Sequence, residues 1–189
     1  MRKAVFIDRD GTLIKDVPYN ADPALISFEY HAAEMLRALK QKDFLLIIIS
    51  NQSGIAKGFF SEHDVLAMHK EIQKRLLQYD VQIDTFYYCP HLKEGEIKEY
   101  AFDCDCRKPK PGLIYRAAHD FNINLKKSWM IGDILNDAEA GNAAGCKTIL
   151  IMNGNETEWI LNDERLPTFT AGSLKEATEI ILKHELEPV

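Results

Sequence analysis

The chain has 189 residues, of which 46% are hydrophobic and 28% are charged, and this composition excludes a disordered chain, a collagen-like repeat and a coiled coil. Its 23 Lys and Arg residues against 29 Asp and Glu residues give a net charge of −6, which disfavours a general nucleic-acid-binding protein. The strongest apolar run, residues 45–49, is far shorter than the roughly 18 residues of a membrane span, and the first seven residues lack the apolar core of a signal peptide. We therefore expect a cytoplasmic monomer that binds neither nucleic acid nor membranes, built as one domain over residues 1–189.

Short apolar runs recur along the chain and alternate with segments of helical periodicity. These runs are apolar at consecutive positions, as strands buried on both faces of a parallel sheet are. They predict five strands, at residues 4–7, 45–49, 85–88, 129–131 and 148–151.

Between the runs, apolar residues spaced by three and four positions predict helices, and several have recognisable ends. Ser61 is expected to cap one helix, and Ser173 with Glu176 forms the capping box of the last. Pro111 suits a first helical turn, and Gly145 ends a helix that begins near Asn136. Strand and helix alternation of this kind predicts an α/β fold with a mostly parallel, Rossmann-like sheet flanked by helices.

Two long connections interrupt the alternation, at residues 13–30 and 89–110. Loops of this length in a compact domain are usually functional. Ligands of open parallel sheets bind at the carboxyl ends of the strands, so the residues that follow each strand are the first candidates for a site.

Each strand end carries a different polar group. Asp8 and Asp10 follow the first strand, residues 50–53 follow the second, and Asp133 follows the fourth, with Asp137 four positions later. The connection after the third strand ends in Arg107 and Lys108. Carboxylates without a nearby His suit Mg²⁺, and Lys, Ser and Asn donors suit phosphoryl oxygens. Each group alone is typical of a turn or a solvated charge run, but the four together indicate phosphoryl transfer.

The same groups resemble the signature of the haloacid-dehalogenase-like phosphatases, in the order Asp8–Thr12, Ser50, Lys108 and Gly132-Asp133 with Asp137. More narrowly, Asp-Arg-Asp-Gly-Thr, Ser-Asn-Gln-Ser-Gly-Ile-Ala-Lys-Gly and Cys-Asp-Cys-Arg-Lys-Pro-Lys-Pro-Gly resemble the D-glycero-D-manno-heptose 1,7-bisphosphate 7-phosphatase family and its histidinol-phosphatase relatives. The resemblance runs to about residue 151. It implies a Mg²⁺-dependent phosphomonoesterase that removes the 7-phosphate through an aspartyl phosphate, in the synthesis of lipopolysaccharide or surface-glycan precursors.

The resemblance also implies a role for each polar group. Asp8 would be the nucleophile, and Asp10 the general acid and then the general base. Mg²⁺ would bind Asp8, the carbonyl of Asp10 and Asp133. The phosphoryl oxygens would be held by three residues, Ser50, Asn51 and Lys108. We expect Asp137 to orient Lys108 or a metal-bound water, and direct ligation of the metal stays open.

The chain leaves no room for an inserted cap domain, so loops are expected to recognise the substrate. The candidate contacts are Asp16, Tyr19, Ser50, Asn51, Gln52, Ser53, Arg107 and Lys108. Arg107 is the candidate for a second, non-reacting phosphate, because its planar fork can bind two oxygens. Tyr19 has the alternative of packing on its own loop. Ile134 stands where many of these phosphatases carry Lys, so any contact made by that Lys is absent.

Three of the four cysteines lie in the connection at residues 89–110. Cys89, His91, Cys104 and Cys106 make a closed Cys₃His set, the composition of a structural zinc site. The alternative is an exposed loop with incidental thiols. The zinc loop of the family matches these four residues, so we expect Zn²⁺ to staple the loop and to fix Arg107 and Lys108 beyond it.

Two other functions stay open from the sequence. A phosphatase of histidinol phosphate or of another small phosphosugar fits the same motifs. A phospho-accepting receiver domain also gathers Asp, Ser or Thr, Lys and Mg²⁺ at strand ends, but it carries the accepting Asp on its third strand. Here the third strand leads into Cys89.

Overall fold

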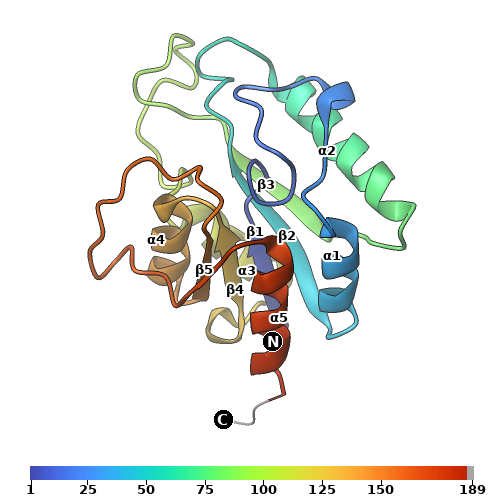
Figure 1. The fold of residues 1–189 in the computed structure, drawn as a ribbon. Helices are drawn as coiled ribbons and strands as arrows, with labels where there is room; N and C mark the ends of the chain where they lie inside the picture. The colour runs from blue at the N-terminus through green and yellow to red at the C-terminus, as the bar shows by residue number, and fades with distance from the viewer. Residues whose placement is uncertain (187–189) are drawn as a thin grey trace.

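The computed structural model describes residues 1–186 and contains a six-stranded sheet in which all strand pairs are parallel (Figure 1). The strand order is β3-β2-β1-β4-β5-β6. The strands are β1 (Lys3–Ile7), β2 (Phe44–Asn51), β3 (Thr85–Cys89), β4 (Trp129–Gly132), β5 (Lys147–Ile151) and β6 (Phe169–Ala171). The predicted α/β class and parallel sheet are confirmed.

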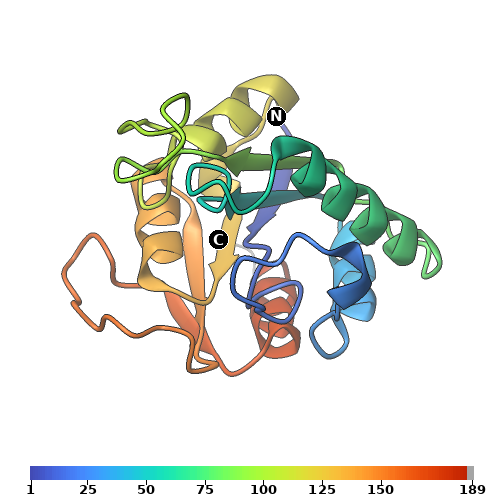
Figure 2. The same cartoon turned by 90° about the horizontal axis from the view of Figure 1, so that it is seen from above.

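Helices cover both faces of the sheet, as Figure 2 shows from above. They are α1 (Ala32–Lys40), α2 (Glu62–Leu77), α3 (Gly112–Phe121), α4 (Leu135–Ala144) and α5 (Leu174–His184). Buried residues of α1, α2 and α5 form one core with the sheet, and those of α3 and α4 form a second core on the other face.

Strand β1 shows why the apolar runs are continuous. Val5 and Ile7 pack into the first core, while Ala4 and Phe6 pack into the second. All four side chains are fully buried, because neighbouring residues of a strand point to opposite faces and both faces are covered.

The helix ends follow the predicted chemistry, with two differences. Ser61 and Asp64 form a complete capping box at α2. At α5, Ser173 accepts from the Glu176 amide, but the Glu176 carboxylate accepts from Gly172 N, so the predicted box is only half made. Pro111 lies just before α3 rather than in its first turn, since that helix begins at Gly112.

The sheet has a sixth strand, β6, that the sequence analysis did not predict. It is three residues long, pairs with β5 at the edge, and buries only Ala171. A short edge strand with one covered face leaves little hydrophobic pattern.

The strand order places β1 between β2 and β4, so the chain switches direction across the sheet at the carboxyl end of β1. Ligands of open α/β sheets bind at such a switch point. The segments after β1 and β3, residues 8–31 and 90–111, lie at this end, at the top of Figure 1, and the segment after β5, residues 152–168, begins there.

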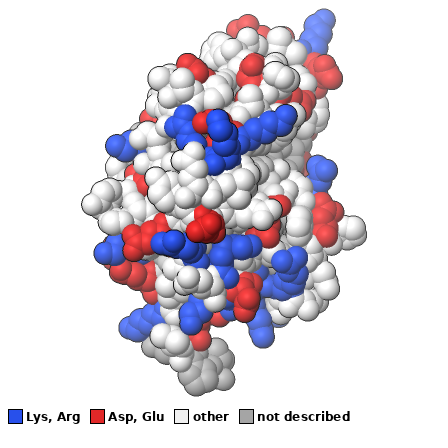
Figure 3. Space-filling view, turned by 90° about the vertical axis from the view of Figure 1, so that its right-hand side faces the viewer, with Lys and Arg blue, Asp and Glu red and all other residues white. Residues whose placement is uncertain are grey.

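Within residues 1–186, no helix combines the length and the apolar character needed to cross a bilayer. On the face in Figure 3, basic and acidic side chains lie beside one another in mixed groups.

Candidate active site

The turn after β1 brings Asp8 and Asp133 together. The Asp8 amide donates to Ile131 O of β4 (2.9 Å), which fixes the nucleophile candidate at the junction of the two strands. Gly11 has a φ of +80°, and a Cβ there would lie 2.0 Å from Asp133 Oδ2. Glycine at this position therefore serves both the turn and the close approach of Asp133.

Three carboxylates and one ammonium group meet in a buried cluster. Asp8, Asp133 and Asp137 each offer an oxygen, and these oxygens lie within 4.8 Å of one another. The Lys108 ammonium forms ion pairs with Asp8 and Asp137 and donates to Ile49 O (3.0 Å). Asp137 and Lys108 are therefore in direct contact.

The charges of this cluster do not balance. Burial raises the pKa of Asp8 well above its usual value, against the effect of Lys108, and Asp137 and Asp133 raise it further. Burial, followed by Asp137, raises the pKa of Asp133 to about 6. Burial lowers the pKa of Lys108, but Asp137 and Asp8 outweigh it and hold that pKa above its usual value. A surplus of buried carboxylate oxygens fits a divalent cation such as Mg²⁺.

Two asparagines after β5 complete the surroundings of Asp133. Asn155 Nδ2 donates to Asp133 Oδ2 (2.7 Å), and Asn153 Nδ2 donates to Gly11 O (2.7 Å). Thr12 Oγ1 donates to the other oxygen of Asp133 (3.3 Å). Neither asparagine was predicted as a site residue, although Asn-Gly-Asn follows a strand as the other polar groups do.

Asn51 makes a contact that differs from the expected one. Its side-chain amide donates to Lys108 O and accepts from Lys108 N, both at 3.0 Å. The amide is thus occupied at both ends by the Lys108 backbone. Asn51 therefore holds the Lys108 backbone in place through its oxygen and one of the two N–H groups of its amide.

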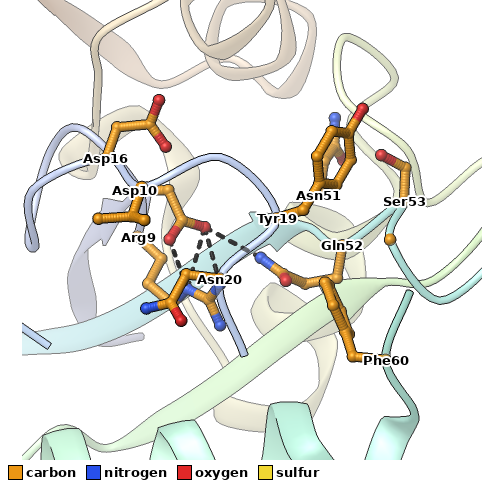
Figure 4. Close-up of a pocket in the computed structure, with 11 residues that line it drawn as sticks. Arg9, Asp10, Asp16, Tyr19, Asn20, Asn51, Gln52, Ser53 and Phe60 are labelled. Atoms are coloured by element: carbon orange, nitrogen blue, oxygen red, sulfur yellow. Dashed lines mark hydrogen bonds and ion pairs between the residues drawn. The ribbon is translucent and has the colours of Figure 1, made fainter. Parts of the chain in front are cut away.

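Beside the acidic cluster lies a pocket of about 150 Å³ (Figure 4). It is lined by Arg9, Asp10, Asp16, Val17, Tyr19, Asn20, Asn51, Gln52, Ser53, Gly54 and Phe60. Gln52 Nε2 donates to Asp10 Oδ2 (3.0 Å) and to Ser50 Oγ (2.6 Å). The predicted contacts Asp16, Tyr19, Asn51, Gln52 and Ser53 therefore line one pocket, and Ser50 lies directly behind Gln52.

Tyr19 packs on a neighbouring loop and also lines the pocket. Its ring meets Phe59 edge to face with centroids 4.9 Å apart. The Lys57 ammonium lies 4.5 Å from the centre of the Tyr19 ring and bonds its hydroxyl. These contacts join the segment after β1 to the turn after β2 over the pocket.

Arg107 lies elsewhere. Its Nη1 donates to His91 O (3.3 Å), and the side chain does not line the pocket. By contrast, Arg9 lines the pocket and lies against Asp10, although no role was predicted for it.

The four expected zinc ligands are brought together at the end of β3. Cys106 Sγ lies 3.1 Å from Cys89 Sγ and 3.3 Å from both Cys104 Sγ and His91 Nδ1. The thiols are free, not joined in disulfides. Hydrogen bonding by Cys89, followed by Cys104 and His91, lowers the pKa of Cys106 to about 5 despite burial. This convergent Cys₃His donor set fits a tetrahedral zinc ion.

Comparison with known proteins identifies the family. Residues 105–177 match the family model of HAD-hydrolase-like proteins. The D-glycero-beta-D-manno-heptose-1,7-bisphosphate 7-phosphatase of Pasteurella multocida is 43% identical over 155 residues, which cover 82% of this chain and 84% of that protein. The chain belongs to the heptose-bisphosphate phosphatase family. The Escherichia coli K12 member is 36% identical over 168 residues, covering 84% and 88% of the two chains.

A solved structure of the heptose-bisphosphate phosphatase family supports the same conclusion. The D,D-heptose 1,7-bisphosphate phosphatase of B. bronchiseptica, complexed with magnesium and phosphate, matches with a TM-score of 0.80 and 26% identity. The match covers 96% of this chain and 99% of that one. The expected resemblance is confirmed, and the protein is a phosphatase of the HAD-like hydrolases.

Proposed function

We propose that this phosphatase removes the 7-phosphate of D-glycero-D-manno-heptose 1,7-bisphosphate, with Mg²⁺ as its cofactor. The observation that carries the proposal is the convergence of Asp8, Asp133, Asp137 and Lys108 beside the pocket. The names of the relatives supply the substrate. The proposal includes a single capless domain, acting as a monomer in the cytoplasm in surface-glycan or lipopolysaccharide precursor synthesis.

In the proposed mechanism, Asp8 attacks phosphorus while the bond to the sugar oxygen breaks. Asp10 gives its proton to that leaving oxygen, so the sugar departs as an alcohol and an aspartyl phosphate remains. Asp10 then takes a proton from the water that attacks the aspartyl phosphate, which releases phosphate and restores Asp8.

Neighbouring residues offset the negative charge of the reacting groups. Lys108, Ser50 and Asn51 bind phosphoryl oxygens, and Asn51 also holds the Lys108 backbone. Asp8, Asp133 and the Asp10 carbonyl would hold Mg²⁺, which reduces the repulsion between carboxylate and phosphate when bound. Arg107 stays our candidate for a contact with the second phosphate.

Phosphate release from a substrate panel tests the proposal. The panel contains both anomers of heptose 1,7-bisphosphate, fructose 1,6-bisphosphate, histidinol phosphate and simple monophosphates, each with Mg²⁺. We expect kcat/KM for the β anomer to exceed that for the non-heptose substrates by at least about a hundredfold, because pocket groups left unpaired by a wrong substrate penalise it. The relatives are named for the β anomer.

Other activity profiles would support a different substrate or a different function. Highest activity on histidinol phosphate would assign the alternative substrate. A flat profile would contradict the heptose assignment and leave the phosphatase chemistry intact. Stable phosphorylation of Asp8 without turnover would favour the receiver-type alternative.

We also propose a structural Zn²⁺ at Cys89, His91, Cys104 and Cys106. Cys104→Ser should strongly reduce the zinc content of the purified protein, because serine is a poor ligand for a site of this kind. Metal analysis by mass spectrometry measures the effect. Cys146→Ala is the control, since Cys146 lies outside the cluster and should leave zinc unchanged. Equal zinc contents in both variants would remove the zinc proposal.

A further inference from the structure

Arg9 lies between Asp8 and Asp10 in the sequence of the turn after β1. Its side chain contacts the carboxylate of Asp10. Its Nε lies 3.1 Å and 3.0 Å from the two oxygens of Asp10, and its Nη2 lies 2.9 Å from Oδ2. Two nitrogens of the guanidinium fork thus face one carboxylate. Such a planar contact fixes the direction of the carboxylate as well as its distance.

The burial of Arg9 is unusual for a cation. The residue is 2% exposed, and its Nη1 has no hydrogen-bond partner among the described residues. The carboxylate in ion-pair contact with it is that of Asp10. A buried ion pair is weak evidence for stability, because removing two charges from water offsets their attraction. The contact is therefore better explained by what it does to Asp10.

A second residue fixes the same carboxylate. Gln52 donates to Asp10 Oδ2 and to Ser50 Oγ, so the Asp10 carboxylate is also tied to the end of β2. Figure 4 shows Arg9 and Gln52 approaching Asp10 from two sides.

Asp10 is not a member of the acidic cluster. Its carboxylate is not among the three that gather, those of Asp8, Asp133 and Asp137. Instead Asp10 lines the pocket beside Gln52 and Tyr19, with 29% of its side chain exposed. The Asp10 carboxylate is therefore accessible to a molecule bound in the pocket.

We propose that Arg9 is a positioning residue that aims the Asp10 carboxyl at the leaving oxygen, with Gln52 as the second support. The inference rests on the proposed function, because it needs Asp10 as the general acid. Arg9 then affects the rate through proton delivery, so its contribution depends on how much the leaving group needs a proton. A sugar alkoxide needs that proton, and a nitrophenolate leaves readily without it.

A comparison of two leaving groups tests this inference. The kcat values of Arg9→Ala, Arg9→Lys and Asp10→Asn are measured on the best sugar phosphate of the panel and on p-nitrophenyl phosphate. Asp10→Asn should lower kcat on the sugar phosphate by about 10²–10⁴-fold and far less on the aryl phosphate. Arg9→Ala should show the same selectivity, with a loss at least about tenfold larger on the sugar phosphate, because misplaced catalytic groups lose rate steeply. Arg9→Lys should recover part of the loss, since it keeps the charge without the fork.

Controls separate this role from a structural one. Arg116→Ala removes an exposed Arg of α3 and should change neither rate. If Arg9→Ala does not fold, Gln52→Leu and Arg9→Lys carry the same comparison. Equal losses on both substrates, with Asp10→Asn still selective, would overturn the role of Arg9 alone. A rise in kcat would also overturn it, because the contact would then restrain Asp10. Loss of selectivity in Asp10→Asn would remove the general acid itself, and with it this inference.

Discussion

Asp8→Asn should reduce phosphate release to below about 1% of the wild-type rate, because an amide cannot form the aspartyl phosphate. The folded protein should not be less stable without Mg²⁺. Burial and the neighbouring carboxylates raise the pKa of Asp8. The charged form of Asp8 therefore destabilises the fold at pH values above the ordinary pKa of an aspartate. A neutral side chain of the same shape removes that repulsion. Steady-state phosphate release and the Tm of the Mg²⁺-free protein are the two measurements.

The control for Asp8→Asn is Asp163→Asn, since Asp163 is exposed on the loop between β5 and β6. It should leave both rate and Tm unchanged. Residual turnover well above 1% in Asp8→Asn would contradict the nucleophile assignment. A large fall in Tm with no turnover would show that the variant lost its fold, and Asp8→Glu, which keeps the charge, would then test the assignment.

Lys108→Met should damage both activity and stability. We expect a loss of about 10²–10³ in kcat, the range seen when one donor to a reacting oxyanion is removed. We also expect a loss of roughly 3–5 kcal/mol in the free energy of unfolding, because buried carboxylates lose their cation. The raised pKa of Lys108 gives the same sign, since its charged form stabilises the fold below its unfolded pKa and this contribution disappears only as pH rises through the folded pKa.

Urea denaturation in buffer that contains neither Mg²⁺ nor a chelator measures this effect. Added Mg²⁺ should restore part of the lost stability, because a divalent cation supplies the missing positive charge. Lys110→Met is the matched control: Lys110 pairs with Asp103 at the surface, so this substitution should change the free energy of unfolding far less than Lys108→Met does. A Lys108→Met variant as stable as the wild type would show that the cluster carries less charge than its geometry implies.

The fold was predictable where burial is complete. Runs such as 45–49 are apolar on both faces because two helix layers cover them, and that pattern is visible in the sequence alone. Strand β6 was not visible, because it buries one residue and depends on pairing with β5. The half-made capping box at Ser173 depends on a choice of side-chain direction that spacing does not determine.

Most residues of the candidate site were predictable from the sequence, but fewer of the contacts that they make were. Asp8 and Asp133 were predicted because they follow parallel strands, whose carboxyl ends meet at one edge of the sheet, and Lys108 because it ends the connection after the third strand. The amide of Asn51 was expected to face a ligand, and only the fold shows it bound to the Lys108 backbone. Arg9 and Asn155 were missed because their partners, a neighbouring carboxylate and one 22 positions away, are set by side-chain direction and loop path.

The ion pair between Lys3 and Glu185 places the beginning of β1 and the end of α5 side by side. Both lie at the end of the sheet opposite the pocket (Figure 1). A short peptide could therefore join the beginning of β1 to the end of α5 without approaching Asp8, and new termini could be introduced in the exposed segment 158–164. The architecture is thus suited to circular permutation, with the catalytic edge of the sheet left free of both the junction and any tether attached there.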